Sequence, residues 1–555
     1  MLVLGACSRS PESPESPAGD PSASIAAAAS AALAATITPE VAAAVSAGAE
    51  PAIAWREPHG QAEVEAAFAE AQKLGQPVFV YWGAVWCPPC NQVRATVFNR
   101  PDFIAKSRGF VAIYLDGDQP GAQKLGARFK VRGYPTMILF RPDGSELTRL
   151  PGEVDAQKYL QVLALGLGAA RPVRQVLAQA QSAPTKLSAD DWRLLAYYAW
   201  DTDEQQLVGK HSLAPTLRRL AAACPPAQAE AATRLALQAL LAEAGEEGKA
   251  NAKVPRNHAA AREKLLTVLA DDALARQNLD IVTNYAQELS GLLTAPGTPE
   301  REQLASVWAA TLDRLTADAR LSQGDRMAAL VSRIALARLG APKDAPLSAV
   351  LQEHVRLQTA RADREVASDI ERQAVMTSAA HALSQAGLLG DSDRLLNAEL
   401  KRSHSPYYAM LQLAANAGQR GDKGAALGWY ERAYKESRGP ATRVQWGASY
   451  VSALVELAPE DAARIAQAAA SVLGELKGQP DAFYDRTARS LERMSGKLLA
   501  WSHGAERAAV LGRLRAQRDG LCTALPANDA QRATCEGLLV APARLPAGAR
   551  SATHT

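Results

Sequence analysis

The sequence predicts a multidomain protein in which an α/β domain is followed by a large all-helical domain. Short β-branched and aromatic runs gather early in the chain, as at 77–82 and 111–116. From about residue 171, Ala/Leu/Arg/Glu-rich segments carry apolar residues at three- and four-residue spacing. At 555 residues the chain is also too long for a single hydrophobic core. We therefore expect an α/β domain over 51–170 and an all-helical domain over 171–540.

The charge balance and the cysteine count exclude two other classes of protein. The chain has 61 Lys and Arg residues against 58 Asp and Glu residues, a formal net charge of +3, without long runs of one sign. We expect no nucleic-acid binding from such a pattern. Six cysteines are too few to form a disulfide scaffold for a chain of this length.

The N-terminal segment 1–50 indicates in which cellular compartment the protein is located. Leu4-Gly5-Ala6-Cys7 resembles the bacterial lipobox, whose cysteine is lipidated, and a Pro/Ser/Glu-rich spacer follows. The residues before Cys7 are too few for a signal peptide, so we expect the true start upstream of Met1. The Ala-rich stretch 25–49 has too few large apolar residues to span a membrane and is interpreted as a linker. The alternative is a chance match in a cytosolic protein.

The most informative motif is Trp86-Cys87-Pro88-Pro89-Cys90. It follows a predicted strand at 77–82 and a turn, and it opens an amphipathic segment. A helix N-terminus presents free backbone N–H groups and a partial positive charge, which favour ionisation of a thiol. Cys87 is therefore the candidate nucleophile. Cys90, one turn further on, is the candidate resolving thiol and would form a redox-active disulfide with Cys87.

Further elements of the α/β domain follow in order. A strand is expected at 111–116 and a helix at 122–130. Arg-Gly-Tyr-Pro-Thr at 132–136 then leads into a strand at 137–140, and Pro-Asp-Gly at 142–144 is a turn before a hairpin partner at 146–150.

These motifs and their spacing make residues 53–167 resemble a thioredoxin-fold domain, most of all the periplasmic thioredoxin-like domain of thiol:disulfide interchange reductases. The resemblance implies that Pro135 is a cis-proline facing the disulfide and that the Tyr134 backbone pairs with an extended substrate. Trp86 would flank the same substrate site. The family commonly carries a buried acid six residues before the first cysteine, where this chain has Tyr81.

Two other interpretations of the cysteine pair are a structural zinc site and a vestigial domain. Half of a structural zinc site would need a second Cys or His pair at ligand spacing, which the sequence lacks, so we expect no metal and no cofactor. The domain could instead be vestigial and only structural. The presence of both thiols, Trp86 and Pro135 argues against that.

The residues between the cysteines bear on the direction of redox chemistry. Pro88 and Pro89 fit the first helical turn, but Pro89 removes a backbone donor that could have faced the Cys87 sulfur. No histidine adds positive charge between the cysteines. Because a well-stabilised thiolate makes a strong oxidant, these features favour a reductase or isomerase.

The pattern of the helical domain predicts stacked helical hairpins. Residues 407–436 resemble a tetratricopeptide unit, with a turn at Gly421-Asp422 and small residues Ala426 and Ala433 seven apart. A similar unit that contains Trp446 is expected to follow. Another, with a turn at Gly390-Asp391, is expected to precede it, so the tetratricopeptide-like region extends over about 376–470. Other helices are expected at 227–244, 259–269, 279–293, 302–317, 326–339 and 481–501. Such hairpins form a concave surface for a peptide or protein, or a body that only packs on the redox domain.

The remaining cysteines lie in the helical domain. Cys522 and Cys535 form a structural disulfide if the protein is exported, or two buried thiols if it is not. Cys224 has no evident partner. Residues 541–555 are expected to be a disordered tail.

Together these features predict a periplasmic, lipid-anchored thiol:disulfide oxidoreductase that acts on protein disulfides. Its partners would be protein thiols and disulfides, an upstream redox partner, and a client on the helical domain. The membrane would be contacted only through the lipid. The alternative is a tetratricopeptide-like scaffold or cell-envelope assembly factor whose thioredoxin-like domain serves for docking.

Overall fold

The computed structural model describes residues 52–131, 133–203, 206–209, 213–250, 258–342 and 345–541. The predicted lipidation site Cys7, the linker and all but the first residue of the predicted tail lie outside these ranges. Residues Ile53–Thr555 form one compact unit. The predicted fold class is confirmed: a thioredoxin-type α/β sheet precedes a large all-helical region.

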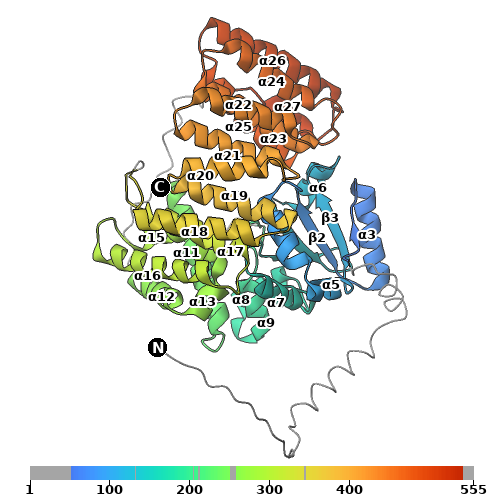
Figure 1. The fold of residues 1–555 in the computed structure, drawn as a ribbon. Helices are drawn as coiled ribbons and strands as arrows, with labels where there is room; N and C mark the ends of the chain where they lie inside the picture. The colour runs from blue at the N-terminus through green and yellow to red at the C-terminus, as the bar shows by residue number, and fades with distance from the viewer. Residues whose placement is uncertain are drawn as a thin grey trace, which may run out of the picture. The chain divides into compact units, whose positions relative to one another are not determined.

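A single five-stranded sheet forms the α/β part, in the order β1-β3-β2-β4-β5 (Figure 1). Its strands are β1 Trp55–Arg56, β2 Val78–Gly83, β3 Val111–Asp116, β4 Thr136–Phe140 and β5 Glu146–Leu150. The central strand β2 pairs parallel with β3 and antiparallel with β4, and β4 and β5 form the predicted hairpin. Because β2 is the central strand, the residues that follow it lie at the middle of one edge of the sheet.

Helices cover both faces of this sheet. They are α3 Gln61–Leu74, α4 Pro88–Val93, α5 Pro101–Ser107, α6 Ala122–Phe129 and α7 Ala156–Leu167, with a π-helical turn at Arg94–Phe98 that continues α4. Because strand side chains alternate between faces, Val78, Val80 and Trp82 pack with α3 and α6, whereas Phe79 and Tyr81 pack with α4, α5 and α7.

The helical region follows α7 without a break in packing. Its helices are α8 Val173–Ser182, α9 Ala189–Ala196, α10 Leu213–Ala223, α11 Ala229–Ala250, α12 Ala259–Ala270, α13 Asp272–Gln277, α14 Leu279–Asn284, α15 Ala286–Leu293, α16 Pro299–Ala317, α17 Gln323–Ala337, α18 Ala349–Glu365, α19 Asp369–Gln385, α20 Leu389–Glu399, α21 Pro406–Gln419, α22 Lys423–Glu436, α23 Pro440–Leu457, α24 Ala462–Glu475, α25 Asp485–Trp501, α26 Ala505–Ala524 and α27 Gln531–Gly537, with a 3-10 turn at Pro184–Lys186. One apolar cluster joins Cys90 of α4 to Trp446 of α23 and Leu491 of α25. The redox domain and the later helices thus share a core.

Several predicted boundaries are wrong, and three of them change which residues form a helix or a turn. The helix expected at 279–293 is two helices that break at Tyr285. The turn expected at Gly390-Asp391 lies earlier, at 386–388, so these two residues belong to the first turn of α20. Asp481 lies before α25 rather than within it, because its carboxylate binds another helix.

Close approach of small residues lets the later helices stack. Ala426 and Ala433 of α22 are fully buried against neighbouring helices. At Gly447 of α23, a Cβ would lie 2.5 Å from Val472 and 2.9 Å from the Tyr434 ring. A larger side chain at position 447 would therefore force α23 away from α22 and α24.

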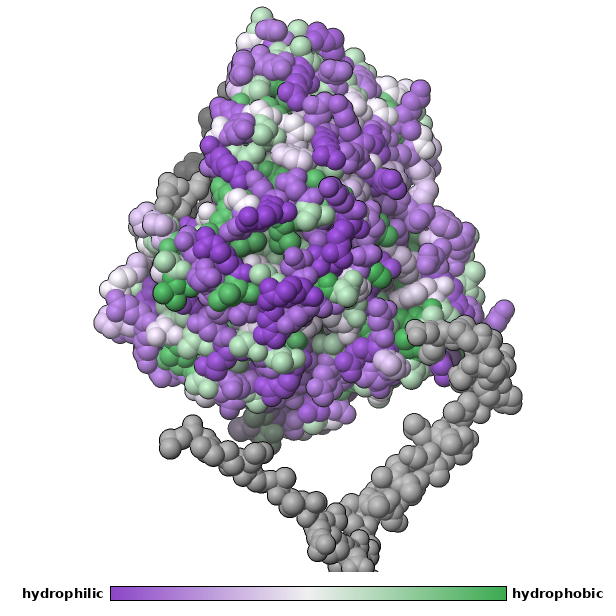
Figure 2. Space-filling view, viewed as in Figure 1, coloured by the Kyte–Doolittle hydropathy of each residue, from purple (hydrophilic) through white to green (hydrophobic). Residues whose placement is uncertain are grey.

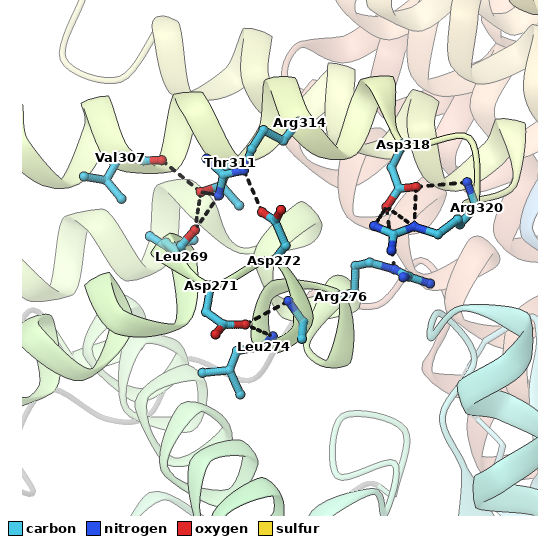
Figure 3. Close-up of polar contacts among 11 residues, drawn as sticks. Leu269, Asp271, Asp272, Leu274, Arg276, Val307, Thr311, Arg314, Asp318 and Arg320 are labelled. Atoms are coloured by element: carbon cyan, nitrogen blue, oxygen red, sulfur yellow. Dashed lines mark hydrogen bonds and ion pairs between the residues drawn. The ribbon is translucent and has the colours of Figure 1, made fainter.

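Ion pairs fasten the earlier helices, as Figure 3 shows for α12, α13 and α16. Arg314 of α16 donates to Asp272 of α13 at 2.8 Å and to the Leu269 carbonyl of α12 at 2.8 Å. Asp318, just beyond α16, accepts from Arg320 at 2.8 Å. One guanidinium therefore bridges three helices.

Hydrophilic residues cover most of the face drawn in Figure 2, and apolar residues gather where α18 and α20 lie in Figure 1. Val350 and Leu357 of α18 are among the most exposed large apolar side chains, at 82% and 60%. Among the described residues, no helix combines the length and the apolar character that crossing a bilayer requires.

Candidate active site

The two cysteines of the motif stand at the start of α4, at the edge of the sheet reached by β2. Cys87 is the N-cap residue of α4, and its sulfur accepts the Cys90 backbone N–H at 3.2 Å. The two sulfurs lie at disulfide distance, with Cα atoms 5.2 Å apart. An N-cap side chain normally accepts from the second or third helical residue, but Pro89 occupies the second position and has no N–H. The Cys87 sulfur therefore has one backbone donor, the Cys90 N–H, where a helix without Pro89 could provide two.

The loop before β4 lies beside this pair. The Tyr134–Pro135 peptide bond is cis. A Cβ at Gly152, just after β5, would lie 3.7 Å from the Pro135 ring. The Tyr134 ring packs edge-on against Trp86 with centroids 5.8 Å apart, and burial raises the pKa of its phenol well above the usual value. The structure thus places the Tyr134 ring against Trp86, the residue before Cys87, and the next peptide bond, to Pro135, is cis.

The redox pair is buried. Cys87 is 3% exposed, Cys90 0% and Trp86 4%. The Trp86 ring stacks on Tyr408 of α21 at 5.9 Å and meets Trp446 of α23 edge-on at 4.8 Å. The side of the pair that a client would approach is therefore covered by the helical region.

A guanidinium completes this cover. Arg486 of α25 lies 5.1 Å from the Trp86 ring centroid and 4.7 Å from that of Tyr134. Both distances are in the range of cation–π attraction. Burial lowers the pKa of Arg486, and the negative faces of the two rings attract its positive charge.

Asp118, beyond β3, links the motif to the helical region. Its carboxylate accepts the Trp86 indole N–H at 3.2 Å, and it also accepts the backbone N–H and the hydroxyl of Thr442 at 2.8 Å and 2.6 Å. Burial raises the pKa of Asp118, while the hydrogen bonds from Thr442 and Trp86 act in the opposite direction. Residues of two domains thus share one half-buried carboxylate.

The position where the family commonly has an acid holds a neutral group. Tyr81 stacks on Tyr114 with centroids 5.1 Å apart, and its buried hydroxyl has no hydrogen-bond partner among the described residues. Burial raises the pKa of Tyr81 far above neutrality. It therefore cannot accept a proton as a carboxylate would. Asp116, at the end of β3, is a buried acid whose pKa is raised to about 6 by burial and by repulsion from Asp118.

A cavity of about 210 Å³ adjoins the pair. It lies between Pro88 and Pro89 on one side, Glu153 after β5, and α14, α17 and α19 on the other. Asp325 of α17 also lines it, and burial raises the pKa of that carboxyl to about 6. Pockets for drug-sized ligands usually span about 300–1,000 Å³. The cavity has no room for an extended peptide.

The other sequence-predicted sites lie elsewhere. Cys522 of α26 and Cys535 of α27 are buried at disulfide distance, with Cα atoms 5.7 Å apart. Cys224 is buried at the end of α10 and, among the described cysteines, is outside any disulfide. In the described part of the chain, no group of three or more His, Cys, Asp or Glu side chains could hold a metal.

Sequence reasoning missed the residues that cover the pair. Asp118, Thr442 and Arg486 have no local motif that marks them, and Thr442 lies 324 residues from its partner. The only local signal was Trp446, which was interpreted as part of a further tetratricopeptide-like unit and gave no sign of what it would pack against.

Comparison with known proteins agrees with this geometry. The family model of the Thioredoxin-like domain matches residues 64–166. Thiol:disulfide interchange protein DsbD of Pseudomonas fluorescens is 36% identical over 104 residues, which are 18% of this chain and 18% of that protein. DsbD 2 of Pseudomonas aeruginosa is 34% identical over 129 residues, 22% of each chain. The chain thus spans only about a fifth of these relatives.

A shorter relative is matched over most of its length. Thioredoxin H-type of Oryza sativa subsp. indica is 30% identical over 94 residues, which are 17% of this chain and 72% of that protein. The family model covers strands β2 to β5, the cysteine pair and the cis-proline, and with this relative it shows that the chain belongs to the thioredoxin-like family.

Proposed function

We propose that this protein is a thiol:disulfide oxidoreductase acting on protein disulfides. Cys87 as thiolate attacks a client disulfide, which forms a mixed disulfide and releases one client thiolate. Cys90 then attacks the Cys87 sulfur, which releases the second client thiolate and forms the Cys87–Cys90 disulfide. Two electrons pass from the pair to the client, and an upstream dithiol must return them. The proposal rests on two sulfurs at disulfide distance at a helix N-terminus, in a domain that also carries a cis-proline.

Reduction or isomerisation is the direction that the site favours. The Cys87 sulfur has one backbone donor, no cationic side chain lies between the cysteines, and the pair is buried. Burial disfavours the charged thiolate. A weakly stabilised thiolate makes the dithiol form a better electron donor.

An envelope location fits the same chemistry. The buried Cys522–Cys535 pair is typical of proteins that fold in an oxidising compartment. The relatives named DsbD are thiol:disulfide interchange proteins. We propose that the chain is exported and that Cys7, outside the described residues, carries the lipid that anchors it.

A second candidate function has one observation in its favour. The redox face packs on the helical region, as it would if the thioredoxin-like domain served only for docking in a tetratricopeptide-like scaffold. In that case the cysteines would have no turnover. The helical region would then bind the partners of the assembly, whereas in the first proposal it holds or selects clients.

Reduction of a small soluble disulfide distinguishes the two functions. The purified wild-type protein is compared with Cys87→Ser and with Cys224→Ser, a matched loss of a thiol away from the site. We expect turnover in wild type and in Cys224→Ser and its loss in Cys87→Ser. Equal rates in all three proteins would remove the enzyme proposal and leave the scaffold.

A further inference from the structure

The helical region contacts the backbone of the loop that carries Cys87, as well as its side chains. The Val85 carbonyl lies 2.8 Å from Nε2 of His404, and the Trp86 carbonyl accepts the Gln373 side-chain amide at 3.3 Å. Together with the ring contacts of Tyr408 and Trp446, these bonds occupy both sides of the residue before the nucleophile. A client peptide could not reach Cys87 through them.

Two helices on opposite sides of this interface lack caps of their own. The N-cap residue of α23 is Gly439 and that of α6 is Gly121, and neither offers a side-chain hydrogen bond. An uncapped helix leaves backbone N–H groups without partners, at a cost when they are buried. Each of these helices needs an acceptor from outside itself.

Each helix receives its acceptor from the other domain. Asp118 of the redox domain accepts the Thr442 N–H in the first turn of α23 at 2.8 Å. Asp481 of the helical region accepts the Gln123 N–H in the first turn of α6 at 2.8 Å. The Gln123 side chain in turn accepts the Arg486 N–H in the first turn of α25 at 3.1 Å. Three helix starts are thus completed only while the two parts are docked.

We propose that the helical region is a closed lid over the redox pair, held by these reciprocal helix caps, and that protein disulfides react only after it swings away. The lid rests on the proposed function, because it decides which disulfides Cys87 can meet. Loss of either cap shifts the protein toward the open form. The covered state protects the reduced pair from the large disulfides around it.

The closed form can be measured without any exchange activity. In the reduced full-length protein, maleimides attached to an ethyl group or to a polyethylene glycol chain of several kilodaltons label thiols, and mass spectrometry quantifies the Cys87 peptide. S145C, in the exposed turn between β4 and β5, supplies the reference for an open site. At each site, the rate of labelling by the small reagent is divided by the rate of labelling by the large one. We expect this ratio to be at least about tenfold higher at Cys87 than at the S145C site. Equal ratios at the two sites would overturn the lid.

A pair of matched variants tests the caps. Asp481→Ala removes the cap of α6 across the interface, whereas Asp461→Ala removes the Arg464 N–H acceptor of α24 within the helical region. We expect D481A to speed labelling of Cys87 by the large reagent about fivefold, as for the loss of one helix cap, and D461A to leave it unchanged. Asp118→Ala, which removes the acceptor of the Thr442 N–H, tests the second cap if D481A does not fold by circular dichroism. A folded cap variant with the wild-type rate would overturn the proposal, and it would do so whatever the turnover of the enzyme.

Discussion

Thr442 donates both its backbone N–H and its hydroxyl to the Asp118 carboxylate, at 2.8 Å and 2.6 Å. The same carboxylate accepts the indole N–H of Trp86, the residue before Cys87. One half-buried acid therefore joins the cysteine motif to the first turn of α23. The covered active site is thus a specific interface, made by hydrogen bonds to a charged group.

The first prediction concerns this bond. Thr442→Val keeps the shape of the side chain but removes one of the donors that offset the charge of Asp118. Because hydrogen bonds to charged groups contribute about 1.5–3 kcal/mol, we expect the free energy of unfolding to fall by about that amount. Urea denaturation measures it. Thr267→Val, whose hydroxyl bonds only to its own helix, is the control, and an equal effect in both variants would contradict the prediction.

The second prediction concerns pH. Burial raises the pKa of Asp116 to about 6, from about 3.9 in an unfolded chain. Between these values the native protein binds more protons than the unfolded chain, so this carboxyl lowers the free energy of unfolding as pH rises. We expect Asp116→Asn to remove this pH-dependent loss of stability. Relative to wild type, its free energy of unfolding should therefore rise more at pH 7 than at pH 4. An identical pH profile in D116N, or the same change in the exposed variant Asp190→Asn, would contradict it.

The third prediction concerns the redox equilibrium. Pro89 lacks the N–H that the second helical residue usually gives to an N-cap side chain. Pro89→Ala restores that donor, which should stabilise the Cys87 thiolate and make the disulfide more oxidising by about tenfold or more in its equilibrium constant with glutathione. Quenched glutathione mixtures measure this constant. Pro101→Ala, at the start of α5, should leave it unchanged, and a shift of P89A toward a more reducing pair would refute the account.

The fourth prediction concerns the C-terminal helices. The Cys522–Cys535 pair joins α26 to α27 across a sequence separation of 13 residues. Closing a loop of this size stabilises a protein by about 3 kcal/mol in the chain-entropy description. We expect Cys522→Ser/Cys535→Ser to lose about that amount in urea denaturation. Reductant should lower the stability of wild type by about that amount more than the stability of the double variant, which keeps only the Cys87–Cys90 pair. An equal effect of reductant on both proteins would contradict the Cys522–Cys535 disulfide.

Sequence periodicity predicted most of the elements of the redox domain. Strands at 111–116 and 146–150 have the expected bounds, because β-branched alternation is a local signal. Helix α3, at Gln61–Leu74, was missed because its alanines and acidic residues give only a weak apolar stripe. The misplaced turn at Gly390 shows the opposite error, since that glycine sits within a helix while Gly387, with positive φ, makes the turn.

The cover over the pair could not be predicted. Thr442 and Asp118 are separated by 324 residues, and each is an ordinary residue in its own neighbourhood. Glycines at the starts of α6 and α23 were the local trace of the missing caps, because a glycine there leaves the backbone donors to another acceptor. Only the packed structure shows where that acceptor comes from.

Trapping of partners on Cys87 tests the central claim most directly. Cys90→Ala removes the resolving thiol, so a client attacked by Cys87 should remain bound as a mixed disulfide. Cys87→Ser/Cys90→Ala is the matched control that cannot form one. We predict protein adducts in cells with C90A that reductant releases and that mass spectrometry assigns to Cys87, and none with the double variant. Adducts equally abundant in both proteins, or absent from an exported and folded C90A, would contradict thiol exchange at this site.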